Sequence, residues 1–95
     1  MNNIPKKLRK QMEADPEYQT CARAHDGGCD GRITYEHAFT YSGRQIQARW
    51  AILPLCFYHH LGRGLDKRKN RFLALRRATA EDLQKVPRLL LNQYK

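Results

Sequence analysis

The sequence lacks long apolar runs, and it has few aromatic and few acidic residues. No stretch approaches the roughly 18 consecutive apolar residues that a membrane span needs, so we expect no transmembrane segment. The first residues, Met1 to Lys7, contain no apolar stretch, and we therefore expect no signal peptide. No internal repeat or low-complexity segment is present, so a single domain over residues 1–95 is the simplest organisation.

Cysteine is also scarce, since the chain has three. Three cysteines cannot all pair within one chain, and without a signal peptide we expect a reducing, cytoplasmic setting. In that setting clustered cysteines and histidines act as metal ligands more often than as disulfides. A domain of this size buries little apolar surface, so a structural metal would add needed stability.

The shortage of acidic residues leaves the chain strongly basic. Eighteen Lys and Arg face nine Asp and Glu, which gives a formal net charge of +9 and a pI near 9.9. This charge predicts an anionic partner. With aromatic residues at 9%, neutralisation of phosphates by salt-sensitive contacts is favoured over base stacking. The alternative is a solvated charged surface that keeps a small protein soluble. The basic residues crowd two segments: Lys6, Lys7, Arg9 and Lys10, and then Arg63, Lys67, Arg68, Lys69, Arg71, Arg76 and Arg77.

The local patterns predict a mixture of helices and short strands. Pro5 suits the first turn of a helix over 5–13, and a glycine-rich loop follows over 19–31. Residues 32–36 and 50–55 favour strands, with a polar segment between them whose Ser42-Gly43 indicates a turn. A helix should begin near Cys56, another should cover 66–77, and a third should begin after an N-cap at Thr79. Helices over 5–13 and 66–93 therefore flank the middle of the chain.

The cysteines have a spacing that suits zinc. Cys21 and Cys29 lie in one glycine-rich loop, and Cys56 precedes His59 by a Cys-x-x-His spacing. Two ligands, a gap and two more ligands from a strand–helix junction form a tetrahedral zinc site in many proteins. His25 and His60 are alternative ligands. The competing interpretation is that the cysteines are small buried hydrophobic residues.

Glu36-His37 and His60 form a second group of interest. Consecutive residues of a strand point to opposite faces, so the Glu36 carboxylate can bind a divalent ion while the His37 imidazole activates a water molecule. If His59 binds zinc, His60 points elsewhere and can complete a metal site with Glu36. The competing interpretation is an ordinary surface Glu-His pair.

These residues resemble the HNH nucleases, also called ββα-metal or His-Me finger nucleases. The resemblance covers residues 21–61 and rests on Glu36-His37, on Ile52-Leu53-Pro54-Leu55-Cys56 and on the Cys-x-x-His-His ending. It implies an α+β fold with a small zinc-stabilised ββα-metal core of two short antiparallel strands and a helix. It also implies that Glu36 and His60 bind a catalytic ion such as Mg2+, that His37 is the general base, and that Cys21, Cys29, Cys56 and His59 hold structural Zn2+.

Two positions depart from the family pattern. Glu36 stands where Asp is usual, and Ala51 stands where an Asn is usual. Ala51 cannot hydrogen-bond to the loop that bears His37, so Gln45, Gln47 or Thr40 would have to take over that role. The small, basic, single HNH-like domain is also similar in style to proteins encoded by phages or prophages.

The resulting expectation is a metal-dependent endonuclease that hydrolyses DNA phosphodiesters. The phosphate backbone would be held by Arg63, Lys67, Arg68, Lys69 and Arg71. One alternative is a zinc-stabilised nucleic-acid-binding module without catalysis, which the absent Asn favours. Another is a small phage adaptor protein that binds a protein partner through Leu89, Leu90, Leu91 and Tyr94.

Overall fold

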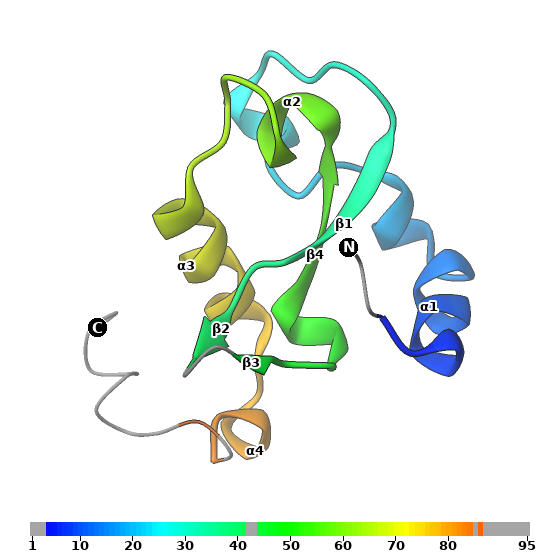
Figure 1. The fold of residues 1–95 in the computed structure, drawn as a ribbon, viewed down its shortest axis with the longest axis vertical. Coiled ribbons are helices and arrows are strands. Elements are labelled where there is room, and N and C mark those ends of the chain that lie inside the picture. The colour runs from blue at the N-terminus through cyan, green and yellow to red at the C-terminus, as the bar shows by residue number, and fades with distance from the viewer. Residues whose placement is uncertain (1–3, 42–43, 85, 87–95) are drawn as a thin grey trace.

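A two-stranded antiparallel sheet lies at the centre of the computed structural model, which describes residues 4–41, 44–84 and 86. The sheet pairs β1 (Ile33–His37) with β4 (Ile52–Cys56), in a register that runs from Ile33 opposite Cys56 to His37 opposite Ile52. Helix α1 (Lys6–Glu13) lies on one side of these strands and helix α3 (Lys67–Arg77) on the other (Figure 1). The molecule is therefore a small α+β structure with helices on both faces of a short sheet.

Strand β4 is apolar because both of its faces are covered, and all five of its residues are buried. Pro54 is tolerated in this strand because a two-stranded sheet leaves one edge of each strand without a ladder partner. At that free edge the Pro54 carbonyl accepts a hydrogen bond from the Ala22 N–H at 2.7 Å. The segment that follows α1 is thus fixed to the outer edge of β4.

The two faces of the sheet pack into separate clusters. On the side of α1, Ile52 and Tyr35 pack with Ile4, Met12 and Tyr18. The other cluster contains Leu53, Leu55 and Cys56 of β4, Ala74 of α3 and the aromatic pair Phe39 and Trp50, whose ring centroids lie 5.6 Å apart. The adjacent residues Ile52 and Leu53 of β4 therefore pack into different clusters, as the strand period of two requires.

Short elements connect these layers. Helix α2 (Phe57–His60) follows β4 directly, and the short pair of strands β2 (Thr40–Tyr41) and β3 (Arg44–Gln45) lies between β1 and β4 in the chain (Figure 1). None of the helices in the described residues is long and apolar enough to cross a membrane. The remaining elements are the 3-10 helices η1 (Pro16–Gln19), η2 (Ala24–Asp26) and η3 (Arg49–Ala51), the strands β2 (Thr40–Tyr41) and β3 (Arg44–Gln45), and the helices α2 (Phe57–His60) and α4 (Ala80–Leu83).

The expected elements are present with shifted boundaries. The strand expected over 50–55 begins at Ile52, because Trp50 lies in the 3-10 turn η3 and packs its ring against Phe39. Thr79 caps α4 through a capping box with Asp82, as the sequence predicts. The expected helical region over 66–93 comprises α3 and α4 as far as the structure describes it. Ser42-Gly43, residue 85 and residues 87–93 lie outside the described residues.

Tyr18 joins the N-terminal segment to both η3 and α3. It is fully buried, its hydroxyl lies 2.5 Å from the Arg49 carbonyl and 3.2 Å from the Ile52 carbonyl, and it accepts a hydrogen bond from Arg77. Burial raises the pKa of Tyr18, so the hydroxyl keeps its proton for donation. Three chain segments therefore share one phenol oxygen.

We predict that Tyr18→Phe destabilises the fold because it removes the hydroxyl that donates to the Arg49 carbonyl and accepts a hydrogen bond from Nη2 of Arg77. The loss should be about 1–3 kcal/mol, which for a domain of this size lowers Tm by roughly 4–8 °C per kcal/mol. Thermal unfolding followed by circular dichroism measures it. Tyr58→Phe is the matched control, because the Tyr58 hydroxyl makes no hydrogen bond to the described residues. Equal Tm values for the two variants would contradict this account.

Candidate metal centre and active site

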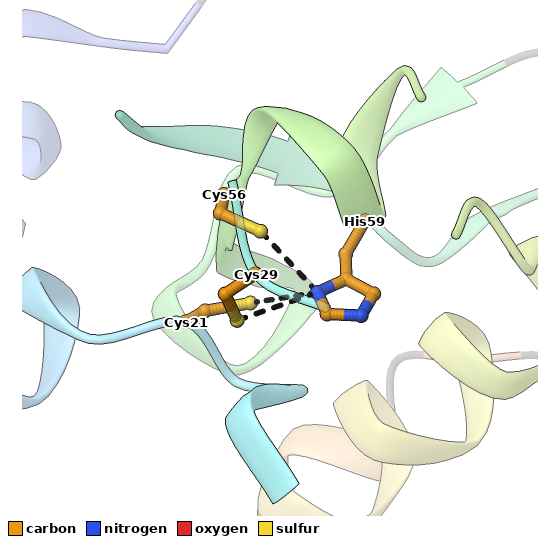
Figure 2. Close-up of side chains that lie close together, drawn as sticks. All are labelled: Cys21, Cys29, Cys56 and His59. Atoms are coloured by element: carbon orange, nitrogen blue, oxygen red, sulfur yellow. Dashed lines mark hydrogen bonds between the residues drawn. The ribbon is translucent and has the colours of Figure 1, made fainter. Parts of the chain in front are cut away.

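Four side chains from distant parts of the chain converge on one point. The sulfur atoms of Cys21, Cys29 and Cys56 lie 3.4, 3.7 and 3.3 Å from Nδ1 of His59 (Figure 2). The four ligand atoms all lie within 4.8 Å of one another. Among the described residues this is the one group of three or more His, Cys, Asp or Glu side chains close enough to hold an ion.

The three sulfur–nitrogen distances match the geometry of a tetrahedral zinc site. Zinc binds Cys sulfur at about 2.3 Å and His nitrogen at about 2.0 Å, so the edges of the tetrahedron are roughly 3.3–3.8 Å long. The three sulfur–nitrogen distances of 3.3–3.7 Å fall within this range. Three thiolates and an imidazole are also a common ligand set of structural zinc. The group is consistent with zinc.

Backbone hydrogen bonds bring the cysteines to this point. The bond from Ala22 to Pro54 sets Cys21 beside the end of β4, where Cys56 lies. The carbonyls of Asp30 and Arg32 accept bonds of 3.1 Å from the first two N–H groups of α2. These two bonds fix the loop that carries Cys29 against the helix that carries His59.

Two glycines allow the chain to pass close to the cluster. Gly28 has a φ of +77°, and a Cβ there would lie 3.1 Å from the Tyr58 ring. A Cβ at Gly64 would lie 2.8 Å from the His59 ring. A side chain at either position would push the aromatic residues of α2 away from the thiols, so the cysteine loop needs glycine at 28 and the turn before α3 needs it at 64.

An ionic network links the cysteine loop to α3. The Asp26 carboxylate accepts from Lys69 at 2.8 Å and from Arg23 at 2.8 Å, and Arg23 also donates to the Gly64 carbonyl. The Lys69 ammonium and then the Arg23 guanidinium hold the pKa of Asp26 at about 2. The network fixes α3 relative to the metal cluster.

The thiols differ in their environments. Cys21, Cys56 and His59 are buried and Cys29 is exposed, although its sulfur faces the cluster. Partial burial and hydrogen bonding with the Cys56 and Cys21 thiols raise the pKa of Cys29 to about 11. Burial opposes ionisation of Cys56 as well, but backbone hydrogen bonds from His59 and Asp30 and the neighbouring thiols lower its pKa to about 6.

The four residues expected to bind zinc, Cys21, Cys29, Cys56 and His59, are the four that the structure brings together. His25, the alternative ligand in the loop, is exposed and outside the group. His60, the other alternative, points to β1 instead, where its Nδ1 lies 2.6 Å from the Thr34 hydroxyl. The three cysteines form no disulfide, and their sulfurs face one another and His59 rather than serving only as apolar packing.

A second polar group lies on the face of β1 that is turned toward α3. Thr34 and Glu36 share this face because they are two residues apart. Glu36 accepts a 2.8 Å hydrogen bond from the Asn70 side chain of α3, and Thr34 contacts His60 of α2. Glu36 and His60 therefore reach the same side of the sheet from different elements. No third carboxylate, Cys or His among the described residues joins them in a metal-ligand group.

Burial affects both ionisable members of this group. It raises the pKa of Glu36, against smaller opposing effects of the Asn70 hydrogen bond and of the Lys67 and Arg23 charges. Burial also lowers the pKa of His60 below its usual 6.5. The imidazole of His60 is thus uncharged at neutral pH, which is the form that binds metals.

His37 points to the other side of β1, as its position next to Glu36 predicts. Its Nε2 lies 3.0 Å from Oε1 of Gln47. Ala51 is fully buried in the core and pairs its carbonyl with the Ala38 N–H. Of the three residues named as substitutes for the family Asn, Gln47 is the one that the structure brings to His37.

The basic residues that the sequence predicts to contact the phosphate backbone of DNA lie on α3 and on the loop before it. Arg63, Lys67, Arg68 and Lys69 are exposed. Lys69 is paired with Asp26, and the Arg68 guanidinium lies 5.4 Å from the centre of the Phe72 ring. Arg71 is half-buried and has a partner of its own. Exposed positive charge thus lies on α3, the helix that carries Asn70.

Sequence reasoning missed Asn70 and Thr34. Asn70 is fully buried, and Ala74, one helical turn later, lies in the same core. The i, i+4 spacing of Asn70 and Ala74 marks a buried helix face, but an asparagine within a run of basic residues gives no sign that it contacts a strand residue 34 positions earlier.

In comparisons with known proteins, no family model, no curated protein and no solved structure matches this chain.

We predict that the purified protein binds one zinc ion per chain and that Cys56→Ser loses it. The variant should also melt at least about 10 °C lower, because binding of a structural metal contributes folding energy directly. Elemental analysis and thermal unfolding measure both effects. His25→Ala, which removes a nearby exposed histidine, should keep its zinc. Full zinc content in Cys56→Ser would contradict the site.

Zinc affinity should depend on pH in a defined direction. At pH 7 the Cys29 thiol, with a pKa of about 11, is protonated, whereas Cys56, with a pKa of about 6, is ionised. Zinc must displace the Cys29 proton, so its affinity should rise about tenfold per pH unit for that proton alone. Below about pH 6 Cys56 is protonated too, and the dependence should steepen.

Competition with a chelator between about pH 5.5 and 8 measures how the zinc affinity changes with pH. The expected change is about tenfold per pH unit for each displaced proton. An affinity that does not change over the range would rule out thiol ligands that lose protons on binding.

Proposed function

We propose that this protein is a zinc-stabilised, metal-dependent endonuclease of the HNH (ββα-metal) type that hydrolyses DNA phosphodiester bonds. The observation that carries the proposal is the division of two adjacent histidines between two groups. His59 directs Nδ1 to the three thiols, and His60 directs Nδ1 to Thr34 on the face of β1 that bears Glu36. One turn of α2 thus serves a structural site and a candidate catalytic site.

The hydrogen bonds of Thr34 support a metal-binding role for His60. The Thr34 hydroxyl has a single hydrogen and donates it to the Leu55 carbonyl at 2.8 Å. His60 Nδ1, at 2.6 Å from that hydroxyl, must then be the donor. The second ring nitrogen, Nε2, carries the lone pair, and metal-ligating histidines are commonly held through their other nitrogen in this way.

The available donor atoms fit a divalent ion such as Mg2+ or Mn2+. Carboxylate and amide oxygens suit these ions, and a neutral imidazole accepts several divalent metals. When bound, such an ion polarises a phosphate and stabilises the charge on the leaving oxygen. Glu36 and His60 would hold it, and Lys67, whose charge acts on Glu36, would attract the phosphate backbone.

Gln47 supports the assignment of His37 as the general base. With the amide oxygen of Gln47 facing Nε2 at 3.0 Å, Nε2 carries the proton and donates it to Gln47. Nδ1 is then the basic nitrogen, able to take a proton from the attacking water. Gln47 would orient the ring, which is the kind of support that the family obtains from an Asn at the position of Ala51.

A zinc-stabilised DNA-binding module without catalysis is the second candidate. The observation that favours it is Ala51, which is fully buried and offers no polar group where the family has Asn. An adaptor role rests on Leu89, Leu90, Leu91 and Tyr94, which lie outside the described residues.

We predict that the protein nicks plasmid DNA in the presence of Mg2+, Mn2+ or Ni2+, and that His37→Ala lowers the rate at least about 100-fold by removing the base. The assay is run beside a gel shift at two salt concentrations. His37→Ala should bind DNA as the parent does, since phosphate contacts come from other residues.

His25→Ala is the matched control and should cleave at the parental rate. A His37→Ala variant that cleaves as fast as the parent would overturn the catalytic assignment. Salt-sensitive binding without cleavage in any of the three metals would establish the second candidate instead.

A further inference from the structure

Asn70 is a polar residue in a position where the fold requires none. It is fully buried on the face of α3 that packs against the sheet, one helical turn before Ala74. An apolar residue would fill such a position at no cost in unpaired polar groups. The contacts of the two polar atoms of the amide therefore indicate why an asparagine stands here.

The orientation of the amide is fixed by chemistry. Glu36 Oε2 lies 2.8 Å from Nδ2 of Asn70. A carboxylate only accepts hydrogen bonds, so the nitrogen of the amide must face it. The Asn70 oxygen, Oδ1, is consequently directed away from Oε2, and it is buried without a hydrogen-bond partner among the described residues.

A buried amide oxygen without a partner is rare in folded proteins, because most buried polar atoms are paired. An amide that served only to join α3 to β1 would be expected to use both ends. Here one end holds the carboxylate of the candidate ion site and the other end is an oxygen of the type that Mg2+ and Mn2+ accept.

We propose that Asn70 is the third protein group of the divalent-ion site formed by Glu36 and His60. Its Nδ2 fixes the Glu36 carboxylate, and its Oδ1 faces the ion, directly or through one of the ion's waters. This inference rests on the proposed function for the identity of the site. It goes beyond the resemblance to HNH nucleases, because α3 lies outside residues 21–61, which carry that resemblance.

The assignment explains how the site obtains a third polar group when no further carboxylate, Cys or His among the described residues stands beside Glu36 and His60. It also connects the two metal groups. Lys69, the residue before Asn70, is bound to Asp26 of the cysteine loop. The same turn of α3 is thus attached to the loop of the zinc cluster and to Glu36 of the ion site.

The test measures Mn2+ binding to the zinc-loaded protein by titration followed by electron paramagnetic resonance. Asn70→Ala should weaken Mn2+ binding roughly 10- to 100-fold, as expected when a group that orients a ligand is removed. Zinc content should stay at that of the parent. Tyr18→Phe, which loses buried hydrogen bonds on the other side of the sheet, is the control for general destabilisation and should bind Mn2+ normally. Unchanged Mn2+ affinity in Asn70→Ala would overturn the proposal.

Asn70→Asp keeps an oxygen at Oδ1 and replaces the donor by a second oxygen, which keeps the proposal testable if the alanine variant does not fold. Two carboxylates in contact repel each other until a cation lies between them. Mn2+ should therefore raise the Tm of Asn70→Asp by more than it raises that of the parent. No added gain in Tm with Mn2+ would show a purely structural residue and would also overturn the proposal.

The same variants separate this inference from the proposed nuclease activity. If the parent binds Mn2+, Asn70→Ala does not, and neither nicks DNA, the nuclease proposal fails and the role of Asn70 stands. If both nick DNA with the same dependence on Mn2+ concentration, the role of Asn70 fails and the nuclease proposal stands.

Discussion

The meeting of Cys21, Cys29 and Cys56 at Nδ1 of His59 is the contact on which the remaining structure depends. The loop of residues 19–32 contributes little to either core cluster, with Cys21 as its one buried apolar residue. A loop with so few apolar contacts gains little from the hydrophobic effect. Its position is set by the thiols, by the bond from Ala22 to Pro54 and by the two carbonyls that receive the first N–H groups of α2. A metal that joins these ligands would add the stability that a small core lacks.

The position of this loop in turn determines the position of α3. Asp26 binds Lys69, and Arg23 reaches the Gly64 carbonyl in the turn before the helix. Helix α3 then brings Asn70 to Glu36. A continuous set of contacts therefore leads from the thiol cluster through the ionic network to the second polar group. Loss of the metal is expected to disturb Glu36 as well as the loop, although the two groups share no ligand.

The short sheet and the short helix α2 give neighbouring residues different roles. On β1, Tyr35 packs beside Tyr18 with ring centroids 6.1 Å apart, while Glu36 faces Asn70 on the other side. On α2, His59 is buried against the thiols and His60 contacts Thr34. These divisions follow from the strand period of two and from the helical advance of about 100° per residue. Two adjacent residues of one short element can therefore serve two different sites, because their side chains point to different parts of the molecule.

Local patterns in the sequence predicted the parts of this arrangement that depend on short-range rules. The cap at Thr79, the strand that contains Ile33, Thr34 and Tyr35, and the set of Cys21, Cys29, Cys56 and His59 all follow from propensity or ligand spacing. The apolar run over 50–55 predicts a strand that includes Trp50, yet Trp50 packs on Phe39 from a 3-10 turn. The contacts of Asn70 with Glu36 and of Thr34 with His60 join residues 34 and 26 positions apart. Such pairs depend on how the helices pack on the sheet, which no local pattern encodes.

The central claim is that His59 and His60, adjacent in α2, belong to different metal groups. X-ray absorption at the zinc edge of the purified protein tests it most directly, because it counts the sulfur and nitrogen neighbours of the ion. We predict three sulfur atoms at about 2.3 Å and one nitrogen at about 2.0–2.1 Å, with an identical spectrum in the His60→Ala variant. A spectrum with two or fewer sulfur neighbours, or one that changes in His60→Ala, would contradict the division of the two histidines.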